Sequence, residues 1–518
     1  MFQKSTIATL LLFTSPALAQ VADAVPKQKL VTLQQNASAT SQRIAEDQAP
    51  ISGTQADDPP PVKQSLPKYE QAFQDLLPSV RVEGRQYQPM SLSEMMQQRR
   101  VPAVSIAIID NGRVAYVGAF GKADVNSSRS VTPETLFQAA SISKPVVATA
   151  ALALVEQGRL SLDRPVNDQL ISWKVPDHGL GIEPITLRRL LTHTSGLSVS
   201  GFSGYSRGAV VPTVLQILNG LQPASNEPVR VKWKPGAEWH YSGGGMTVAQ
   251  VLMTDVTNEA FPELMHRLIL KPLGMDKSSF EQPDASLRKN ELAVAYDRRG
   301  VAVQGGFNIY PELAAAGLWT TPTDLAKWAL AISASLTGAA DGPIKQTTAK
   351  EMLSPGIGGW GLGLSVSGEG EWLKFGHTGS NLGFKSTLIM FPRRGQGVVI
   401  LSNGDNGASI MAAVAQALGR VLGWPDSGEM IRPLVVSKDT LLARVGKYQG
   451  ERGVVELTLS KNGLMVIPPI GEPFEVIAQP GDVYISPENG ARMKFETDSL
   501  SGRVVAASGG GANWKRVE

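Results

Sequence analysis

The sequence predicts an α+β fold: an antiparallel sheet flanked by helices, with an all-helical subdomain, followed by a small all-β barrel. Two observations predict the first part. Runs typical of strands stand at both ends of the region 104–402, and helical patterns fill its middle. The third observation is a change after Trp424, where short alternating runs separated by turn residues begin and continue over 445–518.

Both ends of the first region carry the expected strands. The runs 104–109 and 114–120 are joined by Asp110-Asn111-Gly112, a sequence that favours a hairpin. Further strands are expected at 361–367, 372–376, 386–391 and 397–402, and helices at 69–77, 144–157, 186–191, 213–221, 246–257 and 261–270. Another helix is expected after Thr321 as N-cap, because Pro322 suits the first helical position. The barrel strands are expected at 454–459, 464–467, 474–477, 493–495 and 504–507.

The N-terminus has the features of a secretory signal peptide over 1–19. Lys4 supplies the positive charge, 7–13 is the apolar run, and Ala17-Leu18-Ala19 favours cleavage after Ala19. The apolar run is too short to span a bilayer, so we expect no stable membrane anchor after cleavage. A periplasmic or secreted location follows from this interpretation.

Length and composition limit the function classes. The 518 residues suggest several segments, which we place at 20–68 for a disordered linker, 69–430 for the mixed domain and 440–518 for the barrel. The net charge of +3 and the lack of a dense basic run argue against nucleic acid. The chain has no cysteine and no His-Glu-x-x-His motif, so we expect no disulfide, no thiol nucleophile, no metal and no cofactor.

Ser141 and Lys144 form a Ser-x-x-Lys motif where the extended run 135–140 meets an apolar helical run. Residues three apart lie on one face of a helix, so the Lys144 amine can lie beside the Ser141 hydroxyl and take its proton. Ser141 would also lie at the helix N-terminus, where backbone N–H groups can face a developing oxyanion. This layout is typical of a serine enzyme that transfers acyl groups.

Two other serines match nucleophile motifs. Ser65 precedes Lys68 by three residues, but proline interrupts the motif and no apolar helix follows. Ser206 lies in a Gly-x-Ser-x-Gly sequence, which requires a strand before it and a helix directly after it. The stretch 198–203 resembles a loop, and Pro212 interrupts any immediate helix. We expect neither serine to be the nucleophile.

Two later segments supply candidates for the rest of the site. Tyr241 follows a Pro-Gly turn and precedes three glycines that give access, so we predict that it is the partner of the base. His377, Thr378 and Gly379 stand at the end of the expected strand 372–376. Gly379 would let substrate lie close to the strand, because it has no Cβ. The backbone N–H of the next residue, Ser380, is the predicted second oxyanion donor, opposite that of the nucleophile.

The chain resembles the serine β-lactamase/penicillin-binding-protein superfamily, because it carries Ser-x-x-Lys, then Tyr-Ser-x, then His-Thr-Gly in this order. The chain is most similar to class C β-lactamases, S12 peptidases and family VIII esterases, and the stretches 190–197, 235–236, 272–275 and 315–325 agree. The C-terminal β-domain is similar to the lipocalin-like module of some members. The resemblance implies a β-lactamase/transpeptidase-like fold, with Ser141 as nucleophile, Lys144 as its paired amine and Tyr241 as general acid/base. It also implies an oxyanion hole formed by backbone groups of Ser141 and Ser380.

Two departures from the family pattern bear on the substrate. Gly243 stands where the Tyr-x-Asn element has its asparagine, so the amide contact to substrate is missing. His377 replaces the lysine of the Lys-Thr-Gly motif, which in the family helps to hold the carboxylate of β-lactams and D-Ala peptides. A histidine is mostly neutral at pH 7. Both changes favour ester or amide substrates without that carboxylate.

We therefore expect an exported serine hydrolase that acts through an acyl-enzyme on ester or amide substrates, either an esterase or a D-aminopeptidase-like enzyme. The sequence does not assign the role of base to Lys144 or to Tyr241 alone, so the two share it. The pKa of at least one of them must fall by about two to three pH units. Two alternatives stay open: a β-lactamase or D-Ala-D-Ala carboxypeptidase, and a non-catalytic binding protein on the same fold. The expected partner is a small-molecule or peptide substrate.

Overall fold

The computed structural model describes residues 67–518 except 79, 178, 181–183, 284–289, 339–341, 426–427, 451–452, 469–472, 488–489, 510–511 and 518. The predicted signal peptide, nearly all of the predicted linker and Ser65 lie outside the described residues. The chain divides into two compact units, 1–61 and 62–518, and all described residues belong to the second. In this described part, no helix is both long enough and apolar enough to cross a membrane.

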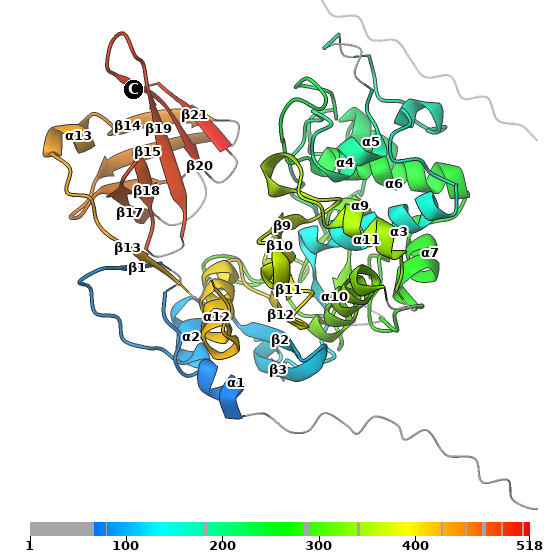
Figure 1. Cartoon of the computed structure of the whole chain (residues 1–518), viewed down its shortest axis with the longest axis horizontal. Helices are drawn as coiled ribbons and strands as arrows, with labels where there is room; N and C mark the ends of the chain where they lie inside the picture. Colours follow the sequence, from blue (N-terminus) through cyan, green and yellow to red (C-terminus); the bar gives the residue numbers. More distant parts are fainter. Residues whose placement is uncertain are drawn as a thin grey trace, which may run out of the picture. The chain divides into compact units, whose positions relative to one another are not determined.

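A seven-stranded antiparallel sheet forms the centre of the mixed domain (Figure 1). Strands from the beginning and the end of the domain meet where β2 pairs with β12, which confirms a sheet built from both ends. In spatial order the strands are β4 (Arg129–Ser130), β3 (Arg113–Asp124), β2 (Ala103–Asp110), β12 (Gln396–Ser402), β11 (Phe384–Phe391), β10 (Lys374–Asn381) and β9 (Ser365–Ser367).

Two of these strands differ from the sequence prediction. Strand β9 begins at Ser365 rather than at 361, because the chain turns at Gly363, which has a φ of +90°. Strand β10 begins after a short 3-10 turn, η5 (Gly370–Trp372), and continues to Asn381 instead of ending at 376. The continuous register with β11, which reaches Asn381 opposite Phe384, carries the strand through the His-Thr-Gly motif.

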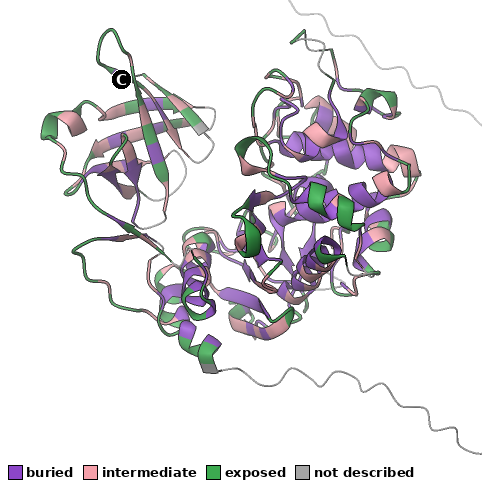
Figure 2. Ribbon diagram, viewed as in Figure 1, coloured by how far each residue is buried: buried purple, intermediate pink, exposed green. Residues whose placement is uncertain are grey.

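The sheet separates two hydrophobic cores. Alternate residues of β2 contribute to each: Ala103 and Ala107 belong to the larger core, whereas Ile106 and Ile108 belong to the smaller one. The larger core includes α3 (Ser143–Glu156), α6 (Gly243–Thr257) and α10 (Pro322–Thr337), and the smaller one α1 (Pro67–Ala72), α2 (Leu92–Gln98) and α12 (Gly407–Leu422). Figure 2 shows the buried residues of both layers in purple. The sequence prediction did not include α12.

Shorter helices complete the mixed domain. They are α4 (Leu187–Leu191), α5 (Val214–Asn219), α7 (Phe261–Met265) with a π-helical continuation η3 (His266–Leu270), α9 (Leu313–Ala316), α11 (Gln346–Met352), and the 3-10 turns η1 (Ala140–Ile142), η2 (Val166–Asp168) and η4 (Ile357–Gly359). The start of α10 is as predicted, because the Thr321 side chain accepts a hydrogen bond from the backbone of Asp324 and Pro322 is the first helical residue.

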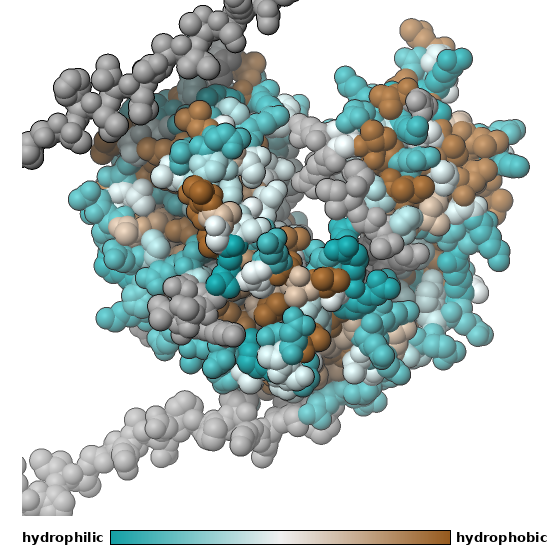
Figure 3. Space-filling model, turned by 180° about the vertical axis from the view of Figure 1, so that it is seen from behind, coloured by the Kyte–Doolittle hydropathy of each residue, from teal (hydrophilic) through white to brown (hydrophobic). Residues whose placement is uncertain are grey.

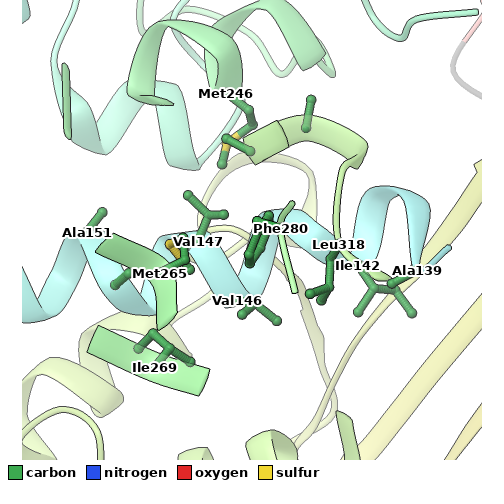
Figure 4. Close-up of a cluster of buried hydrophobic side chains, with 14 of the residues drawn as sticks. Ala139, Ile142, Val146, Val147, Ala151, Met246, Met265, Ile269, Phe280 and Leu318 are labelled. Carbon is green, nitrogen blue, oxygen red and sulfur yellow. The ribbon is translucent and has the colours of Figure 1, made fainter. Parts of the chain in front are cut away.

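Helix α3 runs through the larger core. Every residue from Ser143 to Leu154 is buried. Figure 4 shows its side chains Val146 and Val147 near Phe280 and Met265, which come from other parts of the chain. A helix buried on all sides must be apolar almost throughout, so a lysine in its first turn is an exception that invites a functional explanation.

The C-terminal strands form a closed eight-stranded barrel, which confirms the small all-β domain. The strands, preceded by α13 (Lys438–Leu442), are β14 (Gly446–Gly450), β15 (Gly453–Leu459), β16 (Leu464–Ile467), β17 (Phe474–Gln479), β18 (Val483–Ile485), β19 (Arg492–Thr497), β20 (Val504–Gly509) and β21 (Ala512–Arg516). Buried side chains, including Tyr448, Leu457 and Tyr484, form a core within it. Figure 3 shows the chain from the side opposite to Figure 1, and the surface on that side carries both hydrophilic and hydrophobic residues.

Three two-stranded sheets connect distant segments of the chain. The pair β5 and β8 and the pair β6 and β7 are antiparallel and belong to the mixed domain, whereas β1 and β13 pair in parallel. Their bounds are β1 (Val80–Val82) with β13 (Glu429–Ile431), β5 (Phe137–Gln138) with β8 (Trp319–Thr320), and β6 (Tyr205–Ser206) with β7 (Asn308–Ile309).

Candidate active site

A tight turn between β5 and α3 presents Ser141. The residue before it, Ala140, has a φ of +49°, which is unfavourable for a residue with a Cβ and costs about 1 kcal/mol or more. The Ser143 hydroxyl stabilises the turn, because it donates to the Ala140 carbonyl at 2.6 Å and accepts from the Leu318 N–H at 3.0 Å. Ser141 itself is half-buried at the N-terminal end of the helix.

The Lys144 amine lies against the Ser141 hydroxyl. Its Nζ is 2.9 Å from Ser141 Oγ and donates to the Ala315 carbonyl of α9 at 2.7 Å. The side chain is buried, and burial lowers the pKa of Lys144 from 10.5 to about 7. Near neutral pH a large fraction of the molecules therefore holds an unprotonated amine within reach of the serine proton, as a general base requires.

Tyr241 lies at the other side of Ser141. Its hydroxyl forms a hydrogen bond with the Ser141 side chain, and Lys144 Nζ lies 5.0 Å from the centre of its ring. Burial raises the pKa of Tyr241 above its ordinary value, although the bond to Ser141 opposes the rise. Tyr241 therefore stays protonated at neutral pH, and the electrostatics favour Lys144 as the base, with Tyr241 as a neutral hydroxyl that passes a proton on.

The glycines after Tyr241 form the first turn of α6 rather than an open access route. Ser242 is the N-cap, and its side chain accepts from the Gly245 N–H at 2.8 Å. The Gly243 N–H donates to the Ser200 carbonyl at 3.2 Å, so it is engaged within the protein. A Cβ at Gly243 would lie 3.1 Å from the Phe202 ring. Phe202 thus covers the position from which an asparagine side chain would project.

Strand β10 packs directly against the turn that carries Ser141. A Cβ at Gly379 would lie 2.4 Å from the Ala139 carbonyl oxygen, and the Ser386 hydroxyl donates to the same oxygen at 2.7 Å. Only glycine permits this approach, so the structure assigns Gly379 a packing role that the sequence interpretation did not include.

Strand β10 extends past the end of β9, next to the turn that carries Ser141. The Gly376 carbonyl accepts a hydrogen bond from the Ser365 hydroxyl of β9, and the pairing of the two strands ends at this residue. Backbone groups of residues two apart point to the same side of a strand. Those of Thr378 and Ser380 therefore face the side on which β9 has ended. This orientation suits the Ser380 N–H as an oxyanion donor.

His377 is neutral in this environment. Its ring is buried, and burial together with the charge of Lys144 lowers the pKa of His377 to about 3, against the effect of a bond to the Thr378 backbone. Nδ1 lies 2.6 Å from the Thr378 carbonyl oxygen, so Nδ1 carries the proton and Nε2 is an acceptor. Nε2 has no hydrogen-bond partner within the described part of the chain.

Three further rings surround the pair Tyr241 and His377, and the sequence analysis did not identify any of them as part of the site. The His193 ring lies 4.4 Å from that of Tyr241, Trp360 lies 5.4 Å from His377, and Trp239 lies 5.4 Å from Trp360, measured between ring centres. The three residues lie far apart in the sequence. Only His193 falls in a stretch, 190–197, that agrees with the family pattern.

Of the two competing motifs, the structure describes Ser206 and, from the Ser65 motif, only Lys68 and the proline before it. Ser206 is exposed on the two-residue strand β6, and the chain after it does not become helical until α5 at Val214. Lys68 pairs with Asp110, with 2.9 Å between Nζ and Oδ2. In the described ranges, no group of three or more His, Asp or Glu side chains is arranged to hold a metal ion.

Comparison with known proteins shows the family of the chain. The family model described as Beta-lactamase matches residues 91–421, more than half of the chain. Protein flp of Staphylococcus aureus is 27% identical over 318 residues, which cover 60% of this chain and 61% of that protein. Esterase EstB of Burkholderia gladioli is 30% identical over 212 residues, which cover 39% of this chain and 52% of the esterase. The chain therefore spans between half and two thirds of the length of these relatives.

Solved structures are similar over a longer stretch. The octameric penicillin-binding protein homologue from Pyrococcus abyssi has a TM-score of 0.55 and 25% identity, and the match covers 80% of this chain and 94% of that one. The D-alanine carboxypeptidase AmpC from Burkholderia cenocepacia has a TM-score of 0.51 and 21% identity, and the match covers 64% of this chain and 96% of that one. The second match bears on the fold alone.

Proposed function

The chain belongs to the Beta-lactamase family, and on this premise we propose that it is a serine hydrolase that forms an acyl-enzyme at Ser141 and acts on ester or amide substrates. One observation carries the proposal: an amine with a pKa of about 7, that of Lys144, lies 2.9 Å from the Ser141 hydroxyl. A non-catalytic binding protein has no need of a buried, deprotonated lysine beside a serine.

Acylation begins when the neutral Lys144 amine takes the proton of the Ser141 hydroxyl and Oγ attacks the substrate carbonyl carbon. The resulting oxyanion is held by the backbone N–H groups of Ser141 and Ser380. When the carbonyl re-forms, the bond to the leaving group breaks. The proton held by Lys144 reaches the departing oxygen or nitrogen through the Tyr241 hydroxyl, which gives one proton as it receives another.

Deacylation repeats the sequence with water. The neutral amine of Lys144 takes a proton from the water as its oxygen attacks the acyl carbon, and Ser141 Oγ leaves with the proton returned to it. The net reaction consumes one water and releases a carboxylic acid together with an alcohol or amine. The same pair of residues therefore serves both halves of the cycle.

Neutral surroundings favour an uncharged substrate. His377 carries no charge near neutral pH, and the Phe202 ring covers the Gly243 position. The site thus has an aromatic wall and a neutral imidazole at the positions where the family pattern has an amide and a lysine. Similarity to Esterase EstB supports esters as the first substrate class to test.

Turnover by three variants tests the proposal. Wild type, Ser141→Ala and the control Ser206→Ala are compared on p-nitrophenyl acetate and butyrate and on nitrocefin. We expect ester turnover that is lost in Ser141→Ala and kept in Ser206→Ala, with weak nitrocefin turnover. Strong nitrocefin turnover with weak ester turnover would favour a β-lactamase or carboxypeptidase instead. No turnover of any substrate and no labelling by a penicillin probe would favour a binding protein.

We also propose that the protein is exported, with residues 1–19 removed after Ala19. This proposal depends on the charge at Lys4, the apolar run and the Ala-x-Ala sequence. Peptide mapping of protein purified from the periplasm or medium of a bacterial host is expected to find Gln20 as the first residue. Protein that stays in the cytoplasm with an intact N-terminus would contradict it.

A further inference from the structure

His193 holds the backbone on both sides of Tyr241. Its carbonyl oxygen accepts from the His240 N–H at 2.8 Å, and its ring Nδ1 accepts from the Ser242 N–H at 3.2 Å. One residue therefore binds the backbone N–H groups of both sequence neighbours of Tyr241. That residue comes from a turn 48 positions earlier in the chain.

The His193 ring also lies against the Tyr241 side chain. The ring centres are 4.4 Å apart, and His193 has no exposed surface. Because Nδ1 accepts from a backbone N–H, the proton of the neutral ring is on Nε2. Nε2 has no hydrogen-bond partner among the residues that the structure describes, and the rings of Trp239 and Trp360 lie around it.

The backbone of His193 is in an unusual conformation. Its φ is +57°, in the left-handed region that a residue with a Cβ rarely adopts. This conformation costs about 1–2 kcal/mol. The same turn requires glycine at 196, where φ is +71° and a Cβ would lie 2.0 Å from the Trp233 carbonyl oxygen. A costly conformation is maintained at the residue that holds Tyr241 on both sides, as is common at functional sites.

We infer that His193 is a positioning residue, which holds the Tyr241 hydroxyl against Ser141 and transfers no proton itself. With the N–H groups of both sequence neighbours bound, the backbone that carries Tyr241 is held from both sides. The side chain then retains two torsions, and the His193 ring packs against the Tyr241 ring with 4.4 Å between the ring centres. The inference depends on the proposed function, since the placement of Tyr241 matters only if Ser141 is acylated.

A double-mutant cycle tests the inference against a general structural role. The rate of Ser141 acylation by p-nitrophenyl acetate is measured by stopped flow for wild type, His193→Ala, Tyr241→Phe and the double variant. His193→Asn keeps a side-chain acceptor and tolerates the left-handed backbone, but it lacks the ring. His266→Ala is the matched control, because His266 is exposed on η3 and takes no part in the contacts of Tyr241 named above.

We expect His193→Ala to lower the acylation rate about ten- to hundredfold, because a small misplacement of a catalytic group has effects of this size. KM should stay within about threefold, His193→Asn should recover part of the rate, and His266→Ala should match wild type. In the Tyr241→Phe background, loss of His193 should cost less than about threefold. An equal loss in both backgrounds, or a wild-type rate in His193→Ala, would overturn the inference while leaving the proposed function intact.

The same experiment separates a failure of the proposed function. If wild type is never acylated, the proposed function is wrong, and the inference fails with it. If His193→Ala does not fold, the acylation rate of His193→Asn is compared with that of the parent protein in both backgrounds, with Tyr241 and with Tyr241→Phe. A loss confined to the background that has Tyr241 supports the positioning role, and equal losses contradict it.

Discussion

Replacing Lys144 by methionine should abolish turnover and at the same time stabilise the fold below pH 8. Methionine keeps a straight apolar side chain and removes the charge. The buried lysine has a pKa of about 7 in the folded protein against 10.5 for the free side chain, a difference of 3.5 pH units. At about 1.4 kcal/mol for each unit, wild type is less stable by about 5 kcal/mol below pH 7 than a protein without this amine.

The methionine variant also loses a hydrogen bond. Lys144 Nζ donates to the Ala315 carbonyl, and leaving that buried oxygen without a partner costs about 1–3 kcal/mol. The net gain in the free energy of unfolding below pH 7 is therefore about 2–4 kcal/mol. Catalytic residues commonly reduce the stability of a fold in this way, and replacing them commonly restores it.

The dependence on pH is the diagnostic part of the prediction. Because the folded-state pKa is depressed, the unfolded wild type binds more protons than the folded protein between pH 7 and 10.5. The stability of wild type therefore rises with pH across this window, relative to Lys144→Met. The advantage of the variant should be largest below pH 7 and should vanish or reverse by pH 10.5.

Urea unfolding followed by tryptophan fluorescence at pH 6, 8 and 10 measures this difference. Eight of the nine tryptophans precede the barrel, so the signal reports the mixed domain. Lys350→Met is the matched control, because Lys350 is exposed on α11 and its loss should not change the pH dependence. If Lys144→Met is no more stable than wild type at pH 6, or if the difference is the same at all three pH values, the assignment of a neutralised, buried base is wrong.

Three further predictions concern the same residues. The rate kcat/KM for p-nitrophenyl acetate should rise with a midpoint near pH 7, because the neutral amine of Lys144 is the active form; a flat profile from pH 5.5 to 9 would argue against it. Gly379→Ala should lower the acylation rate by more than about tenfold and reduce the Tm, because the new Cβ would lie 2.4 Å from the Ala139 carbonyl oxygen. Gly201→Ala adds a Cβ in open space and should keep the wild-type Tm, so equal Tm values for the two variants would contradict this packing. Tyr241→Phe should lower kcat by about 10²–10⁴ without moving the pH midpoint, and a moved midpoint would show that Tyr241 is the titrating base.

Local sequence patterns predicted the parts of the site that depend on local geometry. Ser141 and Lys144 are three residues apart on a helix, and that spacing alone brings their side chains together. The sheet built from both ends was inferred from strand-like runs at the two ends of the domain, which became β2 and β12, with helical patterns between them. The contact of Ser141 with Lys144 is local, whereas the sheet was predicted from the order of the elements along the chain.

Tertiary contacts decided what the sequence could not predict. The strand carrying His377 was expected to end at 376, but its pairing with β11 continues it to Asn381 despite the glycine within it. The three glycines after Tyr241 were expected to give access to the site, with the helix beginning only at 246. The Ser242 hydroxyl and the loop carbonyls of Val199 and Ser200 accept hydrogen bonds from their N–H groups, and the helix begins at Gly243.

The rings around Tyr241 illustrate the same limit. His193, Trp239 and Trp360 come from segments far apart in sequence, and no period or motif joins them. Their rings make contact because the turn after α4, the segment before α6 and the turn before β9 meet in the folded domain. The position of Tyr241 could thus be recognised from the sequence, but not the residues that hold it.

The most direct test of the account is the site of covalent labelling. Wild type, Ser141→Ala, Lys144→Met and Ser206→Ala are treated with a fluorophosphonate at pH 8, and the adduct is located by intact mass and peptide mapping. The account predicts one adduct on Ser141 in wild type and Ser206→Ala, no adduct in Ser141→Ala, and strongly slowed labelling in Lys144→Met. An adduct on Ser206, or labelling of Lys144→Met at the wild-type rate, would contradict it.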